Sequence, residues 1–145
     1  LLLYKYGLML PLEALDVVRI AKDIEFTNVN YIKKNPDIFV SILDKKIHEA
    51  KDMLLERFNH ICSQSPKSAR YMYENHTMAG YHEEEGIISA LKHGTLVIGQ
   101  LGLAETLQIL VGCDHTSEDG MKLAKEIESL FNTRCKEFKS NLLLI

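Results

Sequence analysis

The stretch Lys92–Glu105 constrains the fold of this chain more than any other part of its sequence. An apolar run rich in β-branched residues, Thr95–Leu101, lies between two glycines, Gly94 and Gly102. A helical pattern of apolar residues follows directly, over Leu103–Val111. This order predicts a buried strand, a tight glycine turn and a helix. Because the free N–H groups at a helix start point outward, such a turn faces a ligand in many α/β proteins.

As a motif, this turn is not specific. Gly99 and Gly102 lack the third glycine of a dinucleotide-binding fingerprint, because position 105 is Glu, and no Gly-Lys-Ser/Thr of a phosphate loop follows. On these residues alone, a core strand with a glycine-lined bend and a ligand-facing turn are equally good interpretations.

The composition is that of one soluble domain. A hydrophobic fraction of 46% and a charged fraction of 26% are typical of a globular protein of 145 residues. The net charge of −3, without a long basic stripe, argues against nucleic acid as a partner. No apolar run reaches the roughly 18 to 20 residues of a membrane span. Three widely separated cysteines, Cys62, Cys113 and Cys135, predict a reducing, cytoplasmic setting.

Both ends of the chain lie in apolar sequence, at Leu1–Leu10 and at Asn141–Ile145. Segments of this kind are normally buried or paired with other segments. We therefore expect the chain to be a single fragment, residues 1–145, of a larger domain.

A long amphipathic helix is predicted from Pro36, with Asn35 as its cap and Asp37 near its positive end. Its apolar residues recur at steps of three and four over about seven turns: Phe39, Leu43, Ile47, Ala50, Leu54, Phe58 and Ile61. The opposite face carries polar residues whose expected role is solvation and helix pairing: Asp44, Lys45, His48, Lys51, Asp52 and Glu56.

The segments on either side of this helix give weaker signals. Residues 12–21 have apolar positions that favour a helix beginning near Pro11, and Phe26–Ile32 resembles a short strand. After Ser63 comes an irregular stretch of about twenty residues, rich in Tyr and His. A loop of that length is either functional or a covering segment whose aromatic residues pack over the core.

The C-terminal part returns to regular patterns. A short helix is expected through Ile87–Leu91, and Thr116–Asp119 resembles a capping box before a final helix over Leu123–Phe138. Helices alternating with strands indicate an α/β architecture.

Reactive side chains give little support for a catalytic site. Cys113, Asp114 and His115 bring a thiol, a carboxylate and an imidazole together, but no second Cys/His pair has the spacing of a zinc site. Catalytic Cys and His partners usually come from separate elements, so a nucleophilic pair is also disfavoured. Glu83–Glu85 is more typical of a helix start than of an acid–base pair. We therefore predict no metal site and no catalytic residue here.

Two segments resemble a known family. Gly94–Leu107, with the flanking Leu91–His93 and Leu110–Gly112, closely resembles the late catalytic-barrel region of anaerobic, class III ribonucleoside-triphosphate reductases. Asp44–Phe58 resembles the helix that precedes it in those enzymes. The order of the segments also matches, and the similarity spans residues 36–138.

The resemblance implies part of a ten-stranded α/β barrel of the glycyl-radical enzyme type, helix-rich in this window. In that family a cysteine on a finger loop becomes a thiyl radical, which a glycyl radical generates, and formate or a thioredoxin-type donor supplies electrons. The enzymes convert ribonucleotides to deoxyribonucleotides for DNA synthesis. The finger loop, the glycyl-radical segment, the zinc site and the allosteric ATP/dNTP sites are not matched in this window.

We therefore expect this fragment alone to be inactive and to bind no cofactor. The resemblance implies that the parent enzyme acts on ribonucleoside triphosphates and meets a radical-SAM activating enzyme. It also implies a homodimer, without nucleic acid or membrane as partners.

The same resemblance implies a role for the glycine turn, which would line the nucleotide pocket. Gln100, Leu101 and Gly102 would shape the pocket, and backbone N–H groups would meet the substrate phosphates. Glu105 would belong to the same set, although a glutamate at a helix start also complements the helix dipole.

Family members also carry a pocket-facing Asn on a strand after the finger loop. Ala14–Ala21 matches the second half of that strand and places Asp16 where the Asn would be. In the alternative register, Phe26–Asn30 matches the first half and nominates Asn30. The sequence leaves both registers open.

Two other classes remain open from the sequence. The chain could be a small cytosolic helical domain that binds or regulates a partner and has no catalytic activity. It could also belong to another glycyl-radical enzyme that shares the barrel. Pairing of the apolar ends as strands would favour a barrel, whereas ends folded into a closed core would favour the binding domain.

Overall fold

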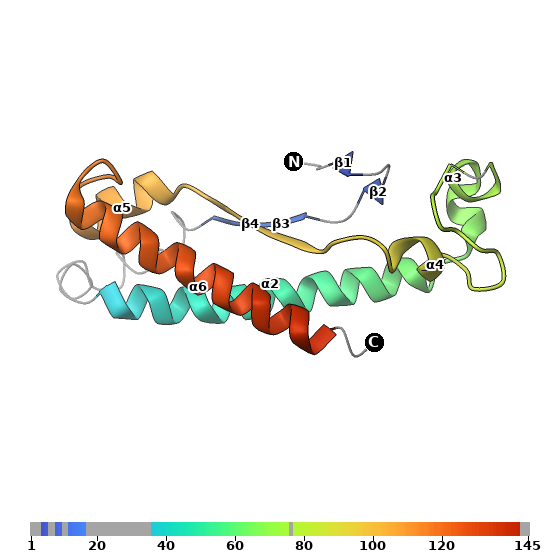
Figure 1. Cartoon of the computed structure of the whole chain (residues 1–145), viewed down its shortest axis with the longest axis horizontal. Coiled ribbons are helices and arrows are strands. Elements are labelled where there is room, and N and C mark those ends of the chain that lie inside the picture. The colour runs from blue at the N-terminus through green and yellow to red at the C-terminus, as the bar shows by residue number, and fades with distance from the viewer. Residues whose placement is uncertain (1–3, 6–7, 10–11, 17–35, 76, 143–145) are drawn as a thin grey trace. The chain divides into compact units, whose positions relative to one another are not determined.

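The computed structural model describes residues 4–5, 8–9, 12–16, 36–75 and 77–142 (Figure 1). The strands are β1 (Tyr4–Lys5), β2 (Leu8–Met9), β3 (Leu12–Asp16) and β4 (Val97–Leu101). The helices are α2 (Pro36–Cys62), the 3-10 helix η1 (Pro66–Ala69), α3 (Arg70–Glu74), α4 (Ile88–Leu91), α5 (Leu103–Val111) and α6 (Glu118–Leu142).

The chain divides into two compact units. The first consists of Leu1–Glu13 and Asp52–Gly99, and the second of Ala14–Lys51 and Gln100–Ile145. The long helix α2 belongs to the second unit up to Lys51 and to the first unit from Asp52 onward.

Helix α2 confirms the amphipathic pattern of the sequence. It runs for 27 residues from Pro36, and Phe39, Leu43 and Ile47 on its apolar face are fully buried. The steps of three and four place these side chains on one stripe of the helix, which is why they share one environment. The expected cap, Asn35, lies outside the described residues.

The second unit has a core built from helices. Helices α5 and α6 pack against each other. Buried apolar side chains of this unit come from α2, α5 and α6: Phe39, Leu43, Ile47, Ala50, Leu107, Leu110, Leu123, Ala124, Ile127 and Phe131.

The first unit has a smaller core, to which the stretch after Ser63 contributes. That stretch is more regular than expected, because it contains η1 and α3. Tyr73 is buried, and its ring lies 4.9 Å from the ring of Tyr81, between centroids. The core cluster comprises Tyr73, Met78, Ile87, Ala90 and Leu91, with Phe58, Ile61, Cys62, Ala69 and Tyr81 packed against it. The aromatic residues Tyr73 and Tyr81 thus cover the core, whereas Tyr71 is 75% exposed.

The strands form two small sheets. β1 and β2 pair in antiparallel fashion, with Tyr4 opposite Met9, and β3 pairs with β4. The helix expected over residues 12–21 is therefore wrong for Leu12–Asp16, because pairing with a distant strand overrides the local apolar spacing. Residues 17–21 and Phe26–Ile32, the other expected strand, lie outside the described residues.

The start of α6 also differs from the expectation. The helix begins at Glu118, and the Ser117 hydroxyl accepts a hydrogen bond from the backbone N–H of Gly120 at 3.1 Å. Ser117 is therefore the cap, and Thr116 is not. The backbone N–H and the hydroxyl of Thr116 both donate to the Asp114 carboxylate, which draws Thr116 away from the capping position.

The helix-rich character of the window is confirmed, since helices make up most of its regular structure. The part of the chain that the structure describes contains two two-stranded sheets and does not display a ten-stranded barrel. None of its helices combines the length and the apolar character that crossing a lipid bilayer requires.

Candidate functional site

The strand, the glycine turn and the helix predicted from the sequence are present, but the strand starts at Val97 and is half-buried with an exposed end, so the prediction of a buried strand is wrong. β4 ends at Leu101, Gly102 has a φ of 82° in the left-handed region, and α5 begins at Leu103. A residue with a Cβ is strained in that conformation, so Gly102 lets the chain reverse from strand to helix within one residue. The glycine is required by the turn itself.

Two hydrogen bonds fix the turn. The backbone N–H and the hydroxyl of Thr106 both donate to the carbonyl oxygen of Gly102, each at 2.9 Å. Thr106 is fully buried, so water does not compete for these bonds. At its other end α5 stops at Gly112, also left-handed, whose N–H donates to Gln108 at 3.0 Å.

The predicted site residues at the turn point in different directions. Gln100 is half-buried, and its side-chain amide donates a hydrogen bond to the carboxylate of Glu128 on α6. Successive side chains of a strand point to opposite faces, so Leu101 lies on the other face, where it is 63% exposed. Glu105 is exposed in the first turn of α5. The turn therefore presents Leu101, Gly102 and Glu105, and Gln100 faces the helix behind it.

The strand expected to carry a pocket-facing Asn has two candidate residues, Asp16 and Asn30. Asn30 lies outside the described residues, so the register that nominates it stays a prediction. Asp16 is the last residue of β3, which pairs with β4.

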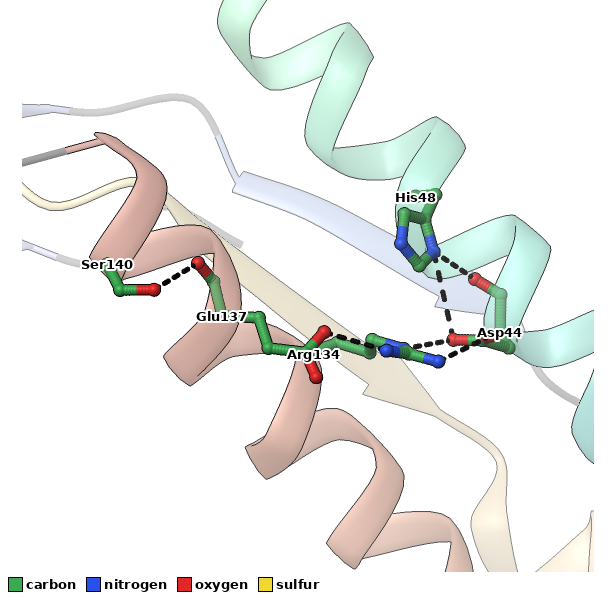
Figure 2. Close-up of polar contacts among 5 residues, drawn as sticks. All are labelled: Asp44, His48, Arg134, Glu137 and Ser140. Atoms are coloured by element: carbon green, nitrogen blue, oxygen red, sulfur yellow. Dashed lines mark hydrogen bonds and ion pairs between the residues drawn. The ribbon is translucent and has the colours of Figure 1, made fainter. Parts of the chain in front are cut away.

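A cluster of charged side chains joins α2 to α6 (Figure 2). Arg134 Nε and Nη2 donate to the two carboxylate oxygens of Asp44 at 2.6 and 2.9 Å, and Nη1 donates to Glu137 at 2.7 Å. His48 Nδ1 donates to the backbone carbonyl of Asp44 at 2.9 Å. The ring of His48 meets the ring of Phe138 edge-on, with 5.1 Å between centroids. The Asp44–Arg134 contact joins two helices through a bidentate ion pair, which indicates a structural link between them.

Part of this cluster could be anticipated from the sequence. Asp44 stands on the polar face that we expected to take part in helix pairing, and the structure confirms that role. Arg134 occupies a position in the apolar spacing of the last helix, where a long cation needs a buried partner. Glu128, by contrast, carries no signal in the sequence, because it is one of many exposed glutamates.

The pH dependence of stability follows from the Asp44–Arg134 pair. The guanidinium beside it lowers the pKa of Asp44 below its ordinary value. A carboxyl group with a lowered folded-state pKa stabilises the fold above its unfolded pKa of about 4 and loses that contribution as pH falls through the folded pKa. Asp44→Asn should therefore lower the melting temperature by a few degrees at pH 7, and the difference from the unmodified protein should shrink below about pH 4.

Thermal unfolding at pH 7 and at pH 3, followed by circular dichroism, would measure how the effect of Asp44→Asn on the melting temperature depends on pH. Glu49→Gln is the control, because Glu49 pairs with Lys46 on an exposed face of the same helix. A gap between Asp44→Asn and the unmodified protein that stays constant down to pH 3 would contradict the assignment.

The residues considered for a metal site serve a turn. The Asp114 carboxylate accepts the two hydrogen bonds from Thr116, and these bonds lower the pKa of Asp114. Cys113 is half-buried and His115 is exposed. Within the described ranges, no three His, Cys, Asp or Glu side chains are grouped as a metal site requires.

An open groove lies at the far end of α5. It is lined by the start of α2, the end of α5 and the first turns of α6: Pro36, Asp37, residues 108–112, Asp119, Lys122, Leu123 and Glu126. Of the predicted site residues that the structure describes, none lines this groove.

The fold and the turn define a helix-rich protein with strands, in which a left-handed glycine leads from an exposed strand end into a helix. The model of the family described as anaerobic ribonucleoside-triphosphate reductase matches residues 19–142, which is most of the chain. The chain therefore belongs to the anaerobic ribonucleoside-triphosphate reductase family, whose members are oxidoreductases. No curated protein and no solved structure matched the chain in the same comparisons.

Proposed function

We propose that this chain is part of the catalytic region of an anaerobic ribonucleotide reductase and that the turn between β4 and α5 lines the nucleotide pocket. The family match carries this proposal, because residues 19–142 include the whole of the turn. The exposure of Leu101 beside the left-handed Gly102 supports it, since a large apolar side chain at a strand end is available for contact with a ligand.

The start of α5 suits a phosphate group. The first N–H groups of a helix, here those of Leu103, Ala104 and Glu105, have no acceptor within the helix. They lie at the positive end of the helix dipole, next to a glycine whose missing Cβ allows close approach. The Glu105 side chain is the weaker member of this set, because its carboxylate would repel a phosphate. It suits the helix dipole or a ribose hydroxyl.

In the parent enzyme, this segment would bind the substrate and other parts would carry out the reaction. Other parts of that enzyme would supply the radical chemistry that removes the ribose 3′-hydrogen and releases the 2′-hydroxyl as water, and formate or a thioredoxin-type donor would supply the electrons for the final reduction. The residues of this segment bind and orient the nucleotide. Cys62 packs against the core of the first unit, and the proposal gives it no part in the radical chemistry.

The proposal extends to the parent enzyme as a whole. It comprises a glycyl radical, a zinc site and allosteric ATP/dNTP sites carried outside this segment, in a cytoplasmic homodimer that a radical-SAM enzyme activates. The segment alone would have no activity, because it would form only part of the nucleotide pocket and would lack the radical.

Photo-cross-linking tests the proposed pocket directly. A diazirine analogue of leucine placed at position 101 of the full-length reductase should attach to radiolabelled ribonucleoside triphosphate under anoxic illumination. An excess of unlabelled substrate should suppress the label. The control carries the diazirine at position 111, where Val111 is 40% exposed at the opposite end of α5. Equal labelling at both positions, or none at position 101, would count against the proposed pocket.

A further inference from the structure

A polar pair joins the end of β4 to α6. The side-chain Nε2 of Gln100 donates a hydrogen bond to Oε1 of Glu128, across 28 positions of sequence. Gln100 is half-buried, whereas Glu128 is on the exposed side of its helix. The pair therefore connects a residue two positions before Gly102 to helix α6 of the same unit.

This contact fixes the orientation of the Gln100 amide. A carboxylate only accepts hydrogen bonds, so the NH₂ group must face Glu128 and Oε1 must point away from it. That oxygen is enclosed by protein and has no hydrogen-bond partner. An enclosed acceptor without a donor is unfavourable for stability, so this orientation of the Gln100 amide has a cost.

Direct contact with the substrate does not account for the unpartnered Oε1 of Gln100. Because no surface of Oε1 is accessible, a ligand cannot reach that atom in this arrangement. The amide also lies on the α6 side of the strand, opposite the exposed Leu101. The side chain of Gln100 thus faces away from the surface on which a nucleotide would lie.

We propose that Gln100 and Glu128 are positioning residues, which tether the end of β4 to α6 and so set the backbone of Leu101 and Gly102 against the nucleotide. Helix α6 is a firm anchor, because Ile127 beside Glu128 is fully buried and Phe131 is 8% exposed. The inference rests on the proposed function, since it assigns a task to the turn that the proposal places in the pocket.

An exchange of the two side chains tests the tether in the full-length reductase. Gln100→Glu sets two carboxylates against each other, and kcat/KM for the ribonucleoside triphosphate should fall on the order of tenfold, as expected for a displaced binding group. The double variant Gln100→Glu with Glu128→Gln restores one amide and one carboxylate with their roles exchanged, and most of the activity should return. Glu126→Gln is the control for α6, because Glu126 is an exposed glutamate of the same helix.

A second variant separates positioning from stability. Gln100→Met keeps the length of the side chain but removes both the tether and the unpartnered oxygen. The melting temperature should therefore stay the same or rise, while kcat/KM falls. A purely structural role would instead lower activity and melting temperature together.

The outcomes distinguish this inference from the proposed function. If Gly102→Val abolishes activity but Gln100→Met and Gln100→Glu remain within about twofold of the unmodified enzyme, the tether is wrong and the pocket stands. Failure of the double variant to recover activity would also overturn the tether. If Gly102→Val is active, the proposed pocket itself is wrong.

Discussion

Replacing Gly102 with Val in the full-length reductase should abolish ribonucleotide reduction and leave the protein folded. Gly102 has a φ of 82°, where a β-branched residue is strongly disfavoured and a side chain costs about 1–2 kcal/mol. That cost is a fraction of the roughly 5–15 kcal/mol that stabilises a typical domain. The loss of activity arises because the new side chain occupies the helix start at which the substrate phosphate is proposed to bind.

Gly112→Val is the matched control for this experiment. Gly112 stands at the other end of α5 with a φ of 75°, and a Cβ built there meets nothing within 4 Å. Both variants therefore carry a similar backbone strain, but only one places a side chain at the proposed pocket. Anaerobic turnover and melting temperature would be measured for both. Activity retained by Gly102→Val, or lost equally in Gly112→Val, would refute the role of the turn.

The turn and α2 could be predicted from sequence because their signals are local. Pro36 at the first position and a stripe of apolar residues define α2 without any knowledge of its neighbours. Gly102 marks the one residue at which the strand must reverse into α5. In both cases the residues that decide the structure lie within a few turns of one another.

The errors arise where distant partners decide the structure. Leu12–Asp16 has helical spacing, but it becomes β3 because it pairs with β4, more than eighty positions further along the chain. The orientation of Gln100 depends on Glu128 in the same way, and no local pattern reveals that carboxylate. The sequence nominates the turn as the candidate site, but it does not show which of the turn's side chains face outward.

Truncating Phe39 to Ala should have the largest effect on stability. Phe39 is fully buried on the apolar stripe of α2, in the unit that contains the turn. Removing a buried phenyl ring costs about 3–5 kcal/mol, because transfer free energy is lost and a cavity remains. A loss of that size is a large part of the free energy of unfolding of a domain, so the variant should melt far below the unmodified protein.

Met53→Ala on the same helix is the control, because Met53 is 51% exposed and its removal should change the free energy of unfolding by less than about 0.5 kcal/mol. Chemical denaturation of the three proteins would measure both differences. Similar unfolding midpoints for Phe39→Ala and Met53→Ala would show that Phe39 is not part of a packed core. In that case α2 and α6 would owe their association mainly to the Asp44–Arg134 pair, and stability would become far more sensitive to pH and salt than a buried apolar core allows.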